Sequence, residues 1–295
     1  MLSANFLVVF FAMSTSVLFG LLSVLVRRGG LYANSMSGIF IGLFVSLPIM
    51  CIVSYAIWKE EWWNLQGIAL FCLAGLAGPA FSRVFLFLSI NNLGVSVTMP
   101  LVATTPLFSS VLAYIFLSER PGPLIWVGTF LIVIGSAVLS YRKTNDENWE
   151  RKKIWMVFVS TIGAGFSFVL RKSAFSYIPD PIVGATISCI TGLFVLCALL
   201  PVLPKNTKPN NMKNKKAWIF YGSCGLINAA GFTLNFAAMS YGDVSIVAPL
   251  TCTAPVFAIL SSYFLLRDLE KITLSICVAT AITVTGAILI SWKFL

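Results

Sequence analysis

The chain has no histidine and little charge of any kind. Asp, Glu, Lys and Arg together make up 10% of its 295 residues, whereas a soluble domain carries about 25%. This shortage excludes an ordinary soluble enzyme, a disordered protein and a disulfide-stapled secreted domain. Without histidine, the chain lacks the commonest general base and metal ligand. The seven cysteines form no CxxC or Cys/His pattern, so no metal site, disulfide or cofactor is predicted.

Apolar sequence, in contrast, is abundant and runs in long stretches. Hydrophobic residues make up 58% of the chain, and its mean hydropathy is +0.93. Because the runs are continuous rather than alternating, and about 20 residues cross a bilayer, they predict spanning helices rather than barrel strands. The predicted fold is an all-α integral membrane protein with ten transmembrane helices, at residues 4–26, 34–58, 66–90, 95–117, 123–141, 153–171, 181–203, 217–239, 244–266 and 272–292.

The basic residues, which give a net charge of +10, gather in the short segments between the apolar runs. There they favour contact with anionic lipid headgroups, so the expected partner is a lipid bilayer and not nucleic acid. Fourteen Lys and Arg lie in loops on one side of the predicted bundle, against five in the loops and tail on the other. Since basic loops tend to stay in the cytoplasm, this count predicts that both termini lie outside.

The chain also contains an internal repeat. A shift of 149 residues places 95–117 on 244–266, and a weaker echo at 144 residues relates 16–27 to 160–171. We therefore predict two five-helix domains, 1–144 and 145–295. Because five is odd, the second copy enters the membrane from the opposite side, as in many secondary transporters. The identical pairs are Val95/Val244, Ser96/Ser245, Pro100/Pro249, Leu101/Leu250, Thr104/Thr253, Pro106/Pro255, Phe108/Phe257, Tyr114/Tyr263 and Leu117/Leu266, and the echo pairs Ser16/Ser160, Ser23/Ser167 and Arg27/Arg171.

The two repeated segments also carry a family resemblance. Each holds two prolines six residues apart and ends in a short Tyr-led run with an acidic residue: Pro100, Pro106 and Tyr114 to Glu119, then Pro249, Pro255 and Tyr263 to Asp268. Together with the ten predicted helices, they resemble the fourth and ninth helices of EamA-type carriers in the drug/metabolite transporter superfamily. The resemblance implies an integral carrier for small metabolites, often an exporter of amino acids or related compounds. It also implies cytoplasmic termini, the opposite of what the loop charges predict.

No acidic residue lies within a predicted span. All ten Asp and Glu fall in loops or within a few residues of a helix end. Proton-coupled carriers normally keep a carboxylate or histidine inside the membrane. Small multidrug transporters of the same superfamily use a glutamate in the first helix, where this chain has Ser14, Thr15 and Ser16. The sequence therefore predicts facilitated diffusion or exchange, and it offers too little acid–base chemistry to predict an enzyme or any catalytic residue.

Arg83 is the one formal charge predicted to lie well inside a span. A guanidinium at this depth can bind a substrate carboxylate or phosphate through two parallel hydrogen bonds. Alternatively, Arg83 snorkels to the interface, because it lies roughly 10 Å of helical rise from the predicted helix end. Both interpretations stay open.

The other candidate substrate-binding residues are polar side chains within predicted spans: Ser16, Ser160, Thr104, Thr253, Asn228 and Asn235. Asn228 and Asn235 are seven residues apart and therefore share one face of a helix. Such groups either line a pathway or hydrogen-bond to neighbouring helices, and packing is the commoner role for any one of them. The candidate kinks or gates, unless they only shape their helices, are Pro100, Pro106, Pro249 and Pro255.

Small residues such as Gly75 and Gly78 are assigned to close helix packing, and Glu119 and Asp268 to helix capping or pairing with a neighbouring arginine. The cavity is expected between predicted helices one, three and four of the first repeat and six, eight and nine of the second. The sequence thus predicts a multi-pass exporter of the cell (inner or plasma) membrane that works by alternating access, as a monomer or, alternatively, as an oligomer. Its expected small-molecule substrate is an amino acid or a similar carboxylate-bearing solute. The alternatives are efflux of drug-like compounds and a non-transporting membrane scaffold or sensor.

Overall fold

The computed structural model describes residues 4–93, 95–140, 153–201, 208–265 and 274–292, and in these residues the chain is helical without strands. Several helices begin where a polar residue separates apolar runs. The Asn34 side chain accepts a hydrogen bond from Ser37 N at 2.9 Å, and the Asp180 carboxylate accepts one from Ile182 N at 2.8 Å. These oxygens satisfy N–H groups that a first helical turn leaves without partners. The predicted all-α class is confirmed.

The helical elements follow one another with short connections. They are α1 (Ala4–Gly29), α2 (Ser35–Ile57), the 3₁₀ turn η1 (Glu60–Trp62), α3 (Leu65–Gly75), the π-helical turn η2 (Leu76–Ser82), α4 (Arg83–Leu93), α5 (Val95–Val102), α6 (Thr105–Phe116), α7 (Pro123–Ser140), α8 (Trp155–Ala174), α9 (Pro181–Leu199), α10 (Lys215–Tyr241), α11 (Val244–Thr251), α12 (Ala254–Leu265) and α13 (Leu274–Trp292).

The outer surface of the bundle is strongly apolar. Tyr55, Leu65 and Phe194 are 75–87% exposed, while polar side chains such as Ser16 and Thr129 are fully buried. This arrangement suits hydrocarbon around the protein, because water would oppose such a large exposed apolar surface. By length and composition, six helical stretches among the described residues can cross a membrane: Asn5–Gly29, Met36–Ile57, Leu65–Leu86, Pro181–Leu199, Lys215–Tyr241 and Val244–Ser261.

Three predicted helices are interrupted in the structure. The predicted segment 66–90 is α3, η2 and α4 in succession, 95–117 is α5 and α6, and 244–266 is α11 and α12. Proline accounts for these interruptions, because it lacks an N–H and clashes with the preceding helical turn. Pro79 lies inside η2, Pro106 lies in the first turn of α6, and Pro255 lies in the first turn of α12. The segment predicted to end at 171 continues to Ala174 as α8.

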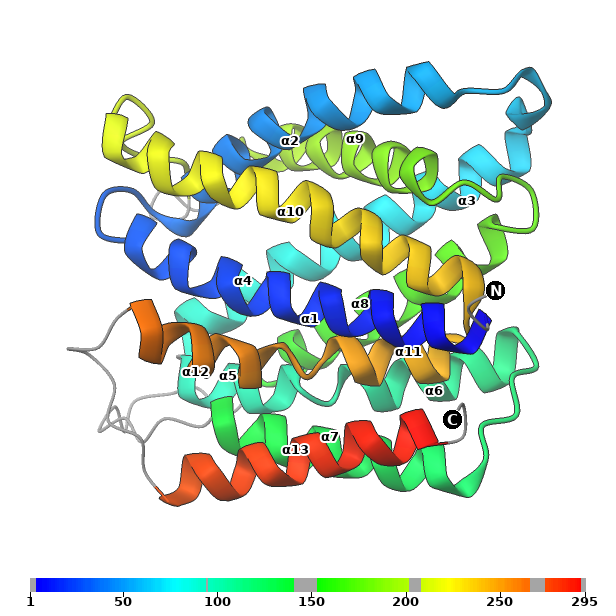
Figure 1. Cartoon of the computed structure of the whole chain (residues 1–295). Helices are drawn as coiled ribbons and strands as arrows, with labels where there is room; N and C mark the ends of the chain where they lie inside the picture. The colour runs from blue at the N-terminus through cyan, green and yellow to red at the C-terminus, as the bar shows by residue number, and fades with distance from the viewer. Residues whose placement is uncertain (1–3, 94, 141–152, 202–207, 266–273, 293–295) are drawn as a thin grey trace.

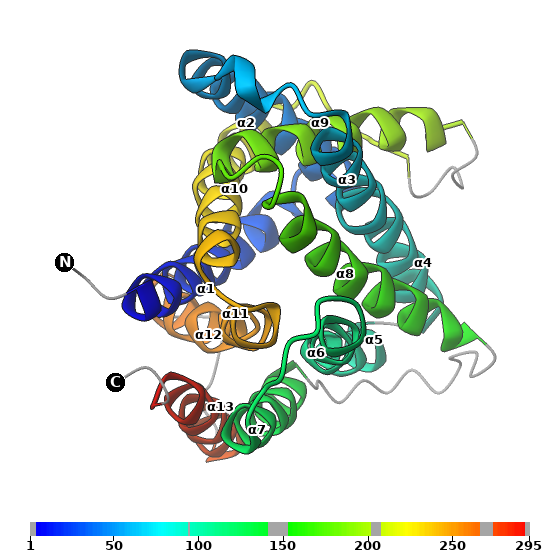
Figure 2. The same ribbon diagram turned by 90° about the vertical axis from the view of Figure 1, so that its right-hand side faces the viewer.

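The helices form one bundle in which the start of α1 and the end of α13 lie at the same end (Figure 1). Viewed along the bundle, α7 and α13 pack together at one edge, and α2 and α9 at another (Figure 2). α1 packs against α10 and α12, and α8 packs against α3, η2, α4 and α6. The two halves of the chain therefore make corresponding contacts with each other.

Contacts near the end of α10 give the relative direction of α1 and α8. Val8, in the second turn of α1, packs against Gly242, where α10 ends. Lys172, in the last turn of α8, donates to the Gly242 carbonyl at 2.7 Å. The start of α1 and the end of α8 thus lie at the same end of the bundle, so these two equivalent helices run antiparallel.

Candidate functional site

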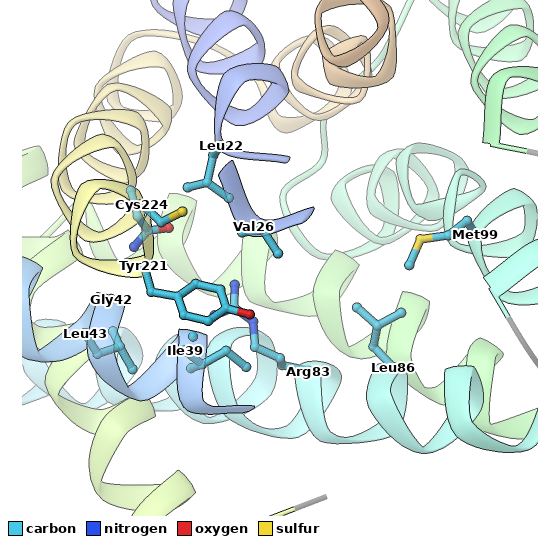
Figure 3. Close-up of a pocket in the computed structure, with 12 residues that line it drawn as sticks. Leu22, Val26, Ile39, Gly42, Leu43, Arg83, Leu86, Met99, Tyr221 and Cys224 are labelled. Atoms are coloured by element: carbon cyan, nitrogen blue, oxygen red, sulfur yellow. The ribbon is translucent and has the colours of Figure 1, made fainter. Parts of the chain in front are cut away.

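Two neighbouring cavities lie inside the bundle and share four wall residues, Leu22, Arg83, Leu86 and Asn228. The first has a volume of about 310 Å³ and includes Tyr221 of α10 (Figure 3). The second, of about 440 Å³, is lined from α1, η2, α4, α5, α6, α8, α10 and α11. These elements belong to predicted segments one, three, four, six, eight and nine, the six from which the sequence predicts a cavity.

Arg83 begins α4 directly after the π-helical turn η2. Inside that turn, Pro79 has no N–H and therefore removes one backbone hydrogen bond from the helix. Just before the turn, the Ala74 carbonyl accepts a hydrogen bond from Ser167 Oγ of α8 at 2.8 Å, which ties α8 to this part of the chain. The Arg83 side chain extends from α4 toward the Tyr221 ring (Figure 3). It lines both cavities and forms no hydrogen bond or ion pair with another described residue.

Arg171 of α8 is the second guanidinium on the wall of the second cavity and is only 5% exposed. Its guanidinium carbon lies 4.7 Å from the ring centre of Phe236, 5.0 Å from that of Phe232 and 5.3 Å from that of Phe168. Each such contact stabilises a cation by about 0.5–2 kcal/mol, depending on desolvation. Nη1 donates to Asn235 Oδ1 at 3.3 Å, and Nε has no partner among the described residues. The faces of three phenylalanine rings thus stabilise the Arg171 guanidinium, which lacks a full set of hydrogen bonds.

The two asparagines of α10 both line the second cavity, as their shared helix face predicts. Asn235 is committed to the protein, because its amide nitrogen donates to Thr251 Oγ1 at 3.2 Å and its oxygen accepts from Arg171. These bonds connect α8, α10 and α11. Asn228, in contrast, lines both cavities and has no hydrogen bond to another described residue. Its amide is therefore available to a solute.

Ser160 joins the two halves of the chain at the cavity wall. Its hydroxyl donates to the Ser82 carbonyl at 2.8 Å, and the Ser82 hydroxyl donates to the Ser160 carbonyl at 2.7 Å. This reciprocal pair brings η2 and α8 into close contact. Close packing continues at Gly78, where a Cβ would lie 2.5 Å from Ser167 Oγ and 3.2 Å from Arg171 Nη2. Only glycine fits there without displacing the α8 side chains.

Ser16 lies outside both cavities and contacts the break between α11 and α12. Its buried hydroxyl is 2.7 Å from the Leu250 carbonyl and 3.1 Å from the Thr251 carbonyl. Pro255 has no N–H to bond to the Thr251 carbonyl, four residues earlier, so that carbonyl needs another donor. Ser16 therefore satisfies backbone groups freed by the helix break.

Thr104 and Thr253, at equivalent positions of the two repeats, also face backbone rather than the central cavities. Thr104 Oγ1 donates to the Leu101 carbonyl at 2.6 Å, and Thr253 Oγ1 donates to the Leu250 carbonyl at 2.8 Å. The same local bond recurs at both helix breaks. Thr253 instead lines a separate, mostly apolar pocket beside α1 and α13. A role for Ser16, Thr104 or Thr253 in substrate binding stays a prediction, without a contact with either central cavity to support it.

The four candidate prolines occupy two kinds of position. Pro106 and Pro255 lie in the first turns of α6 and α12, where a missing N–H disturbs the helix least. Pro249 is a buried residue inside α11, and Pro100 falls within α5, where its side chain is outside the described residues. The chain breaks just before the second proline of each pair. Gating at these breaks stays a prediction.

Neither central cavity has an acidic side chain on its wall within the part of the chain that the structure describes. The described carboxylates lie at the ends of the bundle: Glu60 and Glu61 in η1, Glu119 after α6, Asp180 before α9 and Asp243 before α11. Likewise, no cluster of three or more Cys, Asp or Glu suited to a metal ion occurs among these residues. The walls of the second cavity therefore carry two positive charges and no described negative one.

Glu119 has the capping role that its sequence position predicts. Its carboxylate accepts from Val244 N at 2.8 Å, Ser245 N at 3.0 Å and Ser245 Oγ at 2.7 Å, at the start of α11. A carboxylate at this place also interacts favourably with the positive end of the helix dipole. Close by, Lys172 donates to the carbonyls of Met239 and Gly242. This end of the bundle is thus held together by charged side chains. The equivalent residue Asp268 lies outside the described residues.

Arg171 is the cavity residue that sequence reasoning missed. Its predicted helix ended at residue 171, which grouped Arg171 with the loop charges. A signal was nevertheless present, because Arg171 is four residues after Ser167 and eleven after Ser160, on one face of an α-helix. Arg83, Ser160, Asn228 and Asn235 are the predicted residues that the fold brings to the same cavity.

Comparisons with known proteins agree with this architecture. A solved crystal structure of a protein superposes with a TM-score of 0.79 at 14% identity, covering 97% of this chain and 96% of that chain, which shows a shared fold. Over 154 residues the chain is 23% identical to the uncharacterized transporter YdfC of Bacillus subtilis (strain 168). That match spans 48% of this chain and about half the length of YdfC. The EamA-like transporter family matches residues 6–141 and 151–292. The chain is therefore a multi-pass membrane transporter that belongs to the EamA-like family.

Proposed function

We propose that this transporter has ten membrane passes in two inverted five-helix repeats, 1–144 and 145–295, and works by alternating access. The antiparallel run of α1 and α8, which the 144-residue echo makes equivalent, supports the inversion. The interrupted helices α5–α6 and α11–α12 are the fourth and ninth passes of this arrangement, and α7 and α13 are the fifth and tenth. Discontinuous helices around a central site are typical of secondary transporters.

The proposed substrate is a small carboxylate-bearing metabolite, an amino acid or a similar solute, which the carrier exports across the cell (inner or plasma) membrane as a monomer. The observation that carries this proposal is Arg83, a guanidinium on the wall of both cavities that has no hydrogen-bond or ion-pair partner among the described residues. An intramembrane charge is costly, so it tends to face a cavity or a partner of opposite charge. Cavities of about 310 and 440 Å³ are also within the size range of small-molecule sites.

The proposed mode of transport is facilitated diffusion or exchange without a proton. The support comes from the cavity walls, where the described residues include no Asp or Glu that could bind and release a proton. The sequence contains no histidine that could replace a carboxylate in this role. A substrate gradient alone would then drive net movement.

The test is uptake into liposomes that contain the purified protein, with candidate carboxylates and amino acids supplied on one side and equal pH on both sides. We expect movement down the substrate gradient. The Arg83→Ala variant should lose transport of anionic solutes more than that of neutral ones. An equal loss for both would indicate a packing role, and a strict need for a pH gradient would contradict the proton-free mode.

Efflux of drug-like compounds is the second candidate, favoured by the apolar part of the first cavity. Leu22, Val26, Leu43 and Met99 contribute to its wall. Uptake or binding of neutral aromatic drugs, unaffected by Arg83→Ala, would support this alternative. A partner protein that co-purifies in fixed ratio, with no solute moved, would support a scaffold or sensor instead.

A further inference from the structure

We propose that the central site selects a small dianion, with two carboxylates or one phosphate monoester and no ammonium group. This inference rests on the proposed transport function and narrows its substrate class. A zwitterionic amino acid shares the carboxylate of such a solute but differs in net charge. The proposal thus separates dianions from the amino acids that the sequence favours.

The first argument is the charge of the site. Arg83 and Arg171 both line the second cavity, and the residues described on its wall include no Asp or Glu. Arg side chains stay protonated in proteins, so the wall carries two positive charges. An uncompensated charge in a low-dielectric region is costly. A solute of charge −2 compensates both, whereas a zwitterion compensates neither on balance.

The second argument is the proximity of the two guanidinium groups. Arg171 Nη2 lies 3.2 Å from the position that a Cβ on Gly78 would take. Gly78 precedes Arg83 by five residues, roughly 7 Å of helical rise, and helical side chains lean toward the N-terminus. Both arginines also line the same cavity, whose volume is about 440 Å³. Both guanidinium groups can therefore contact the same small solute in this cavity.

The third argument is the supply of donors. Within the part of the chain that the structure describes, Arg83 and Asn228 have no hydrogen-bond partner. Arg171 uses Nη1 for Asn235, and its Nε has no partner among the same residues. A guanidinium binds a carboxylate or phosphate through a pair of parallel hydrogen bonds. An ammonium group would instead meet two positive charges, and Asn235 Oδ1, an acceptor it could use, already binds Arg171.

The experiment compares solutes of one carbon skeleton on the purified protein: glutarate, glutamate and glutamine, with glycerol 3-phosphate as the phosphate arm. Binding is measured by calorimetry and by the shift in melting temperature. We expect glutarate or glycerol 3-phosphate to bind roughly tenfold or more tightly than glutamine, with glutamate in between. The tighter of the two dianions identifies the anionic group. Failure of both dianions to bind at millimolar concentration overturns the inference.

Two variants and a matched control extend the test. Arg171→Met and Arg83→Met should each reduce dianion binding and shift the preference toward a monoanion such as glutamate. Arg27→Met removes an arginine from the equivalent exposed position of α1, outside both cavities, and should keep the dianion preference. If Arg27→Met changes selectivity as much as Arg171→Met, the preference reflects overall charge and the proposed site is wrong.

Liposome uptake of the same solutes separates this inference from the proposed function. Transport of glutamine without glutarate or glycerol 3-phosphate leaves the carrier function intact and overturns the dianion site. Tight dianion binding with no movement of any solute supports the site and contradicts transport.

Discussion

Helices α1 and α8 carry the same polar pattern in different surroundings. Ser167 donates to the Ala74 carbonyl of a neighbouring element, whereas the equivalent Ser23 donates to the Phe19 carbonyl of its own helix, both at 2.8 Å. Arg171 is buried among aromatic rings, while the equivalent Arg27 is exposed in the last turn of α1. Residues that are equivalent in the sequence repeat therefore have different surroundings in the structure.

This difference teaches that residues at equivalent positions of the repeat have different surroundings in this structure. The polar face of α8 is closed against η2, and Lys172 ties the end of α8 to that of α10. We expect substitutions in α8 to have larger effects than their counterparts in α1 as long as this state predominates.

The largest effect should come from Arg171→Met compared with Arg27→Met. Loss of a charged donor weakens anion binding by about 1.5–3 kcal/mol, or roughly ten- to a hundredfold. The melting temperature should change little, because methionine can keep contact with the three aromatic rings while it removes a buried charge that lacks a full set of hydrogen bonds. Calorimetry with glutarate and thermal unfolding measure the two properties. A large loss of stability with unchanged binding would contradict the site.

Lys172→Met compared with Arg28→Met should give the next largest effect, now on stability. Lys172 donates to the Met239 carbonyl at 3.0 Å and the Gly242 carbonyl at 2.7 Å, near the negative end of the α10 dipole. Its loss should cost about 1.5–3 kcal/mol of unfolding free energy. Arg28, 144 residues earlier, is exposed, and exposed ionic contacts contribute about 0–1 kcal/mol. Equal shifts in thermal unfolding would remove the asymmetry between the helices.

Gly78→Ala should destabilise the protein by about 1–3 kcal/mol, because the new methyl group would overlap Ser167 Oγ and press on Arg171. The control is Gly222→Ala in α10, where the added Cβ would meet only a Val45 methyl at 3.7 Å. That control should be neutral or slightly stabilising, since alanine favours helix. Thermal unfolding of both variants decides whether the close contact of η2 with α8 matters. An equal melting temperature for both would mean that α8 moves away without cost.

The smallest effect should distinguish Ser167→Ala from Ser23→Ala. Ser167→Ala leaves the Ala74 carbonyl without its donor, and a side-chain bond inside a membrane protein contributes about 0.6 kcal/mol, with a maximum of about 1.7. Ser23→Ala removes only a bond to a carbonyl of its own helix, so its effect should be near zero. Chemical unfolding in mixed micelles can resolve this difference. A larger loss for Ser23→Ala would reverse the comparison.

The sequence predicts the helical class and the six segments around the cavity because apolar run length and repeat register are local properties of the chain. Arg83 and Asn228 follow from the same reasoning, since a polar residue inside an apolar run needs a cavity or a partner. Arg171 does not follow from this reasoning, because its predicted helix ended at residue 171 and the structure extends that helix to Ala174. Its three aromatic neighbours also come from two helices, α8 itself and α10. The roles of Ser16, Thr104 and Thr253 also depend on backbone carbonyls whose availability follows from helix breaks.

By itself, the sequence determined that this protein belongs in a membrane, that its chain is duplicated and that acid–base chemistry has little place within its spans. Those properties follow from composition and spacing, which a folded structure cannot alter. Only the tertiary structure decided that Arg171 joins Arg83 on one cavity wall while Arg27, its sequence equivalent, stays exposed. The physical reason is that burial depends on the side chains around a residue. Arg171 lies against the rings of Phe168, Phe232 and Phe236, whereas Arg27 is exposed in the last turn of α1.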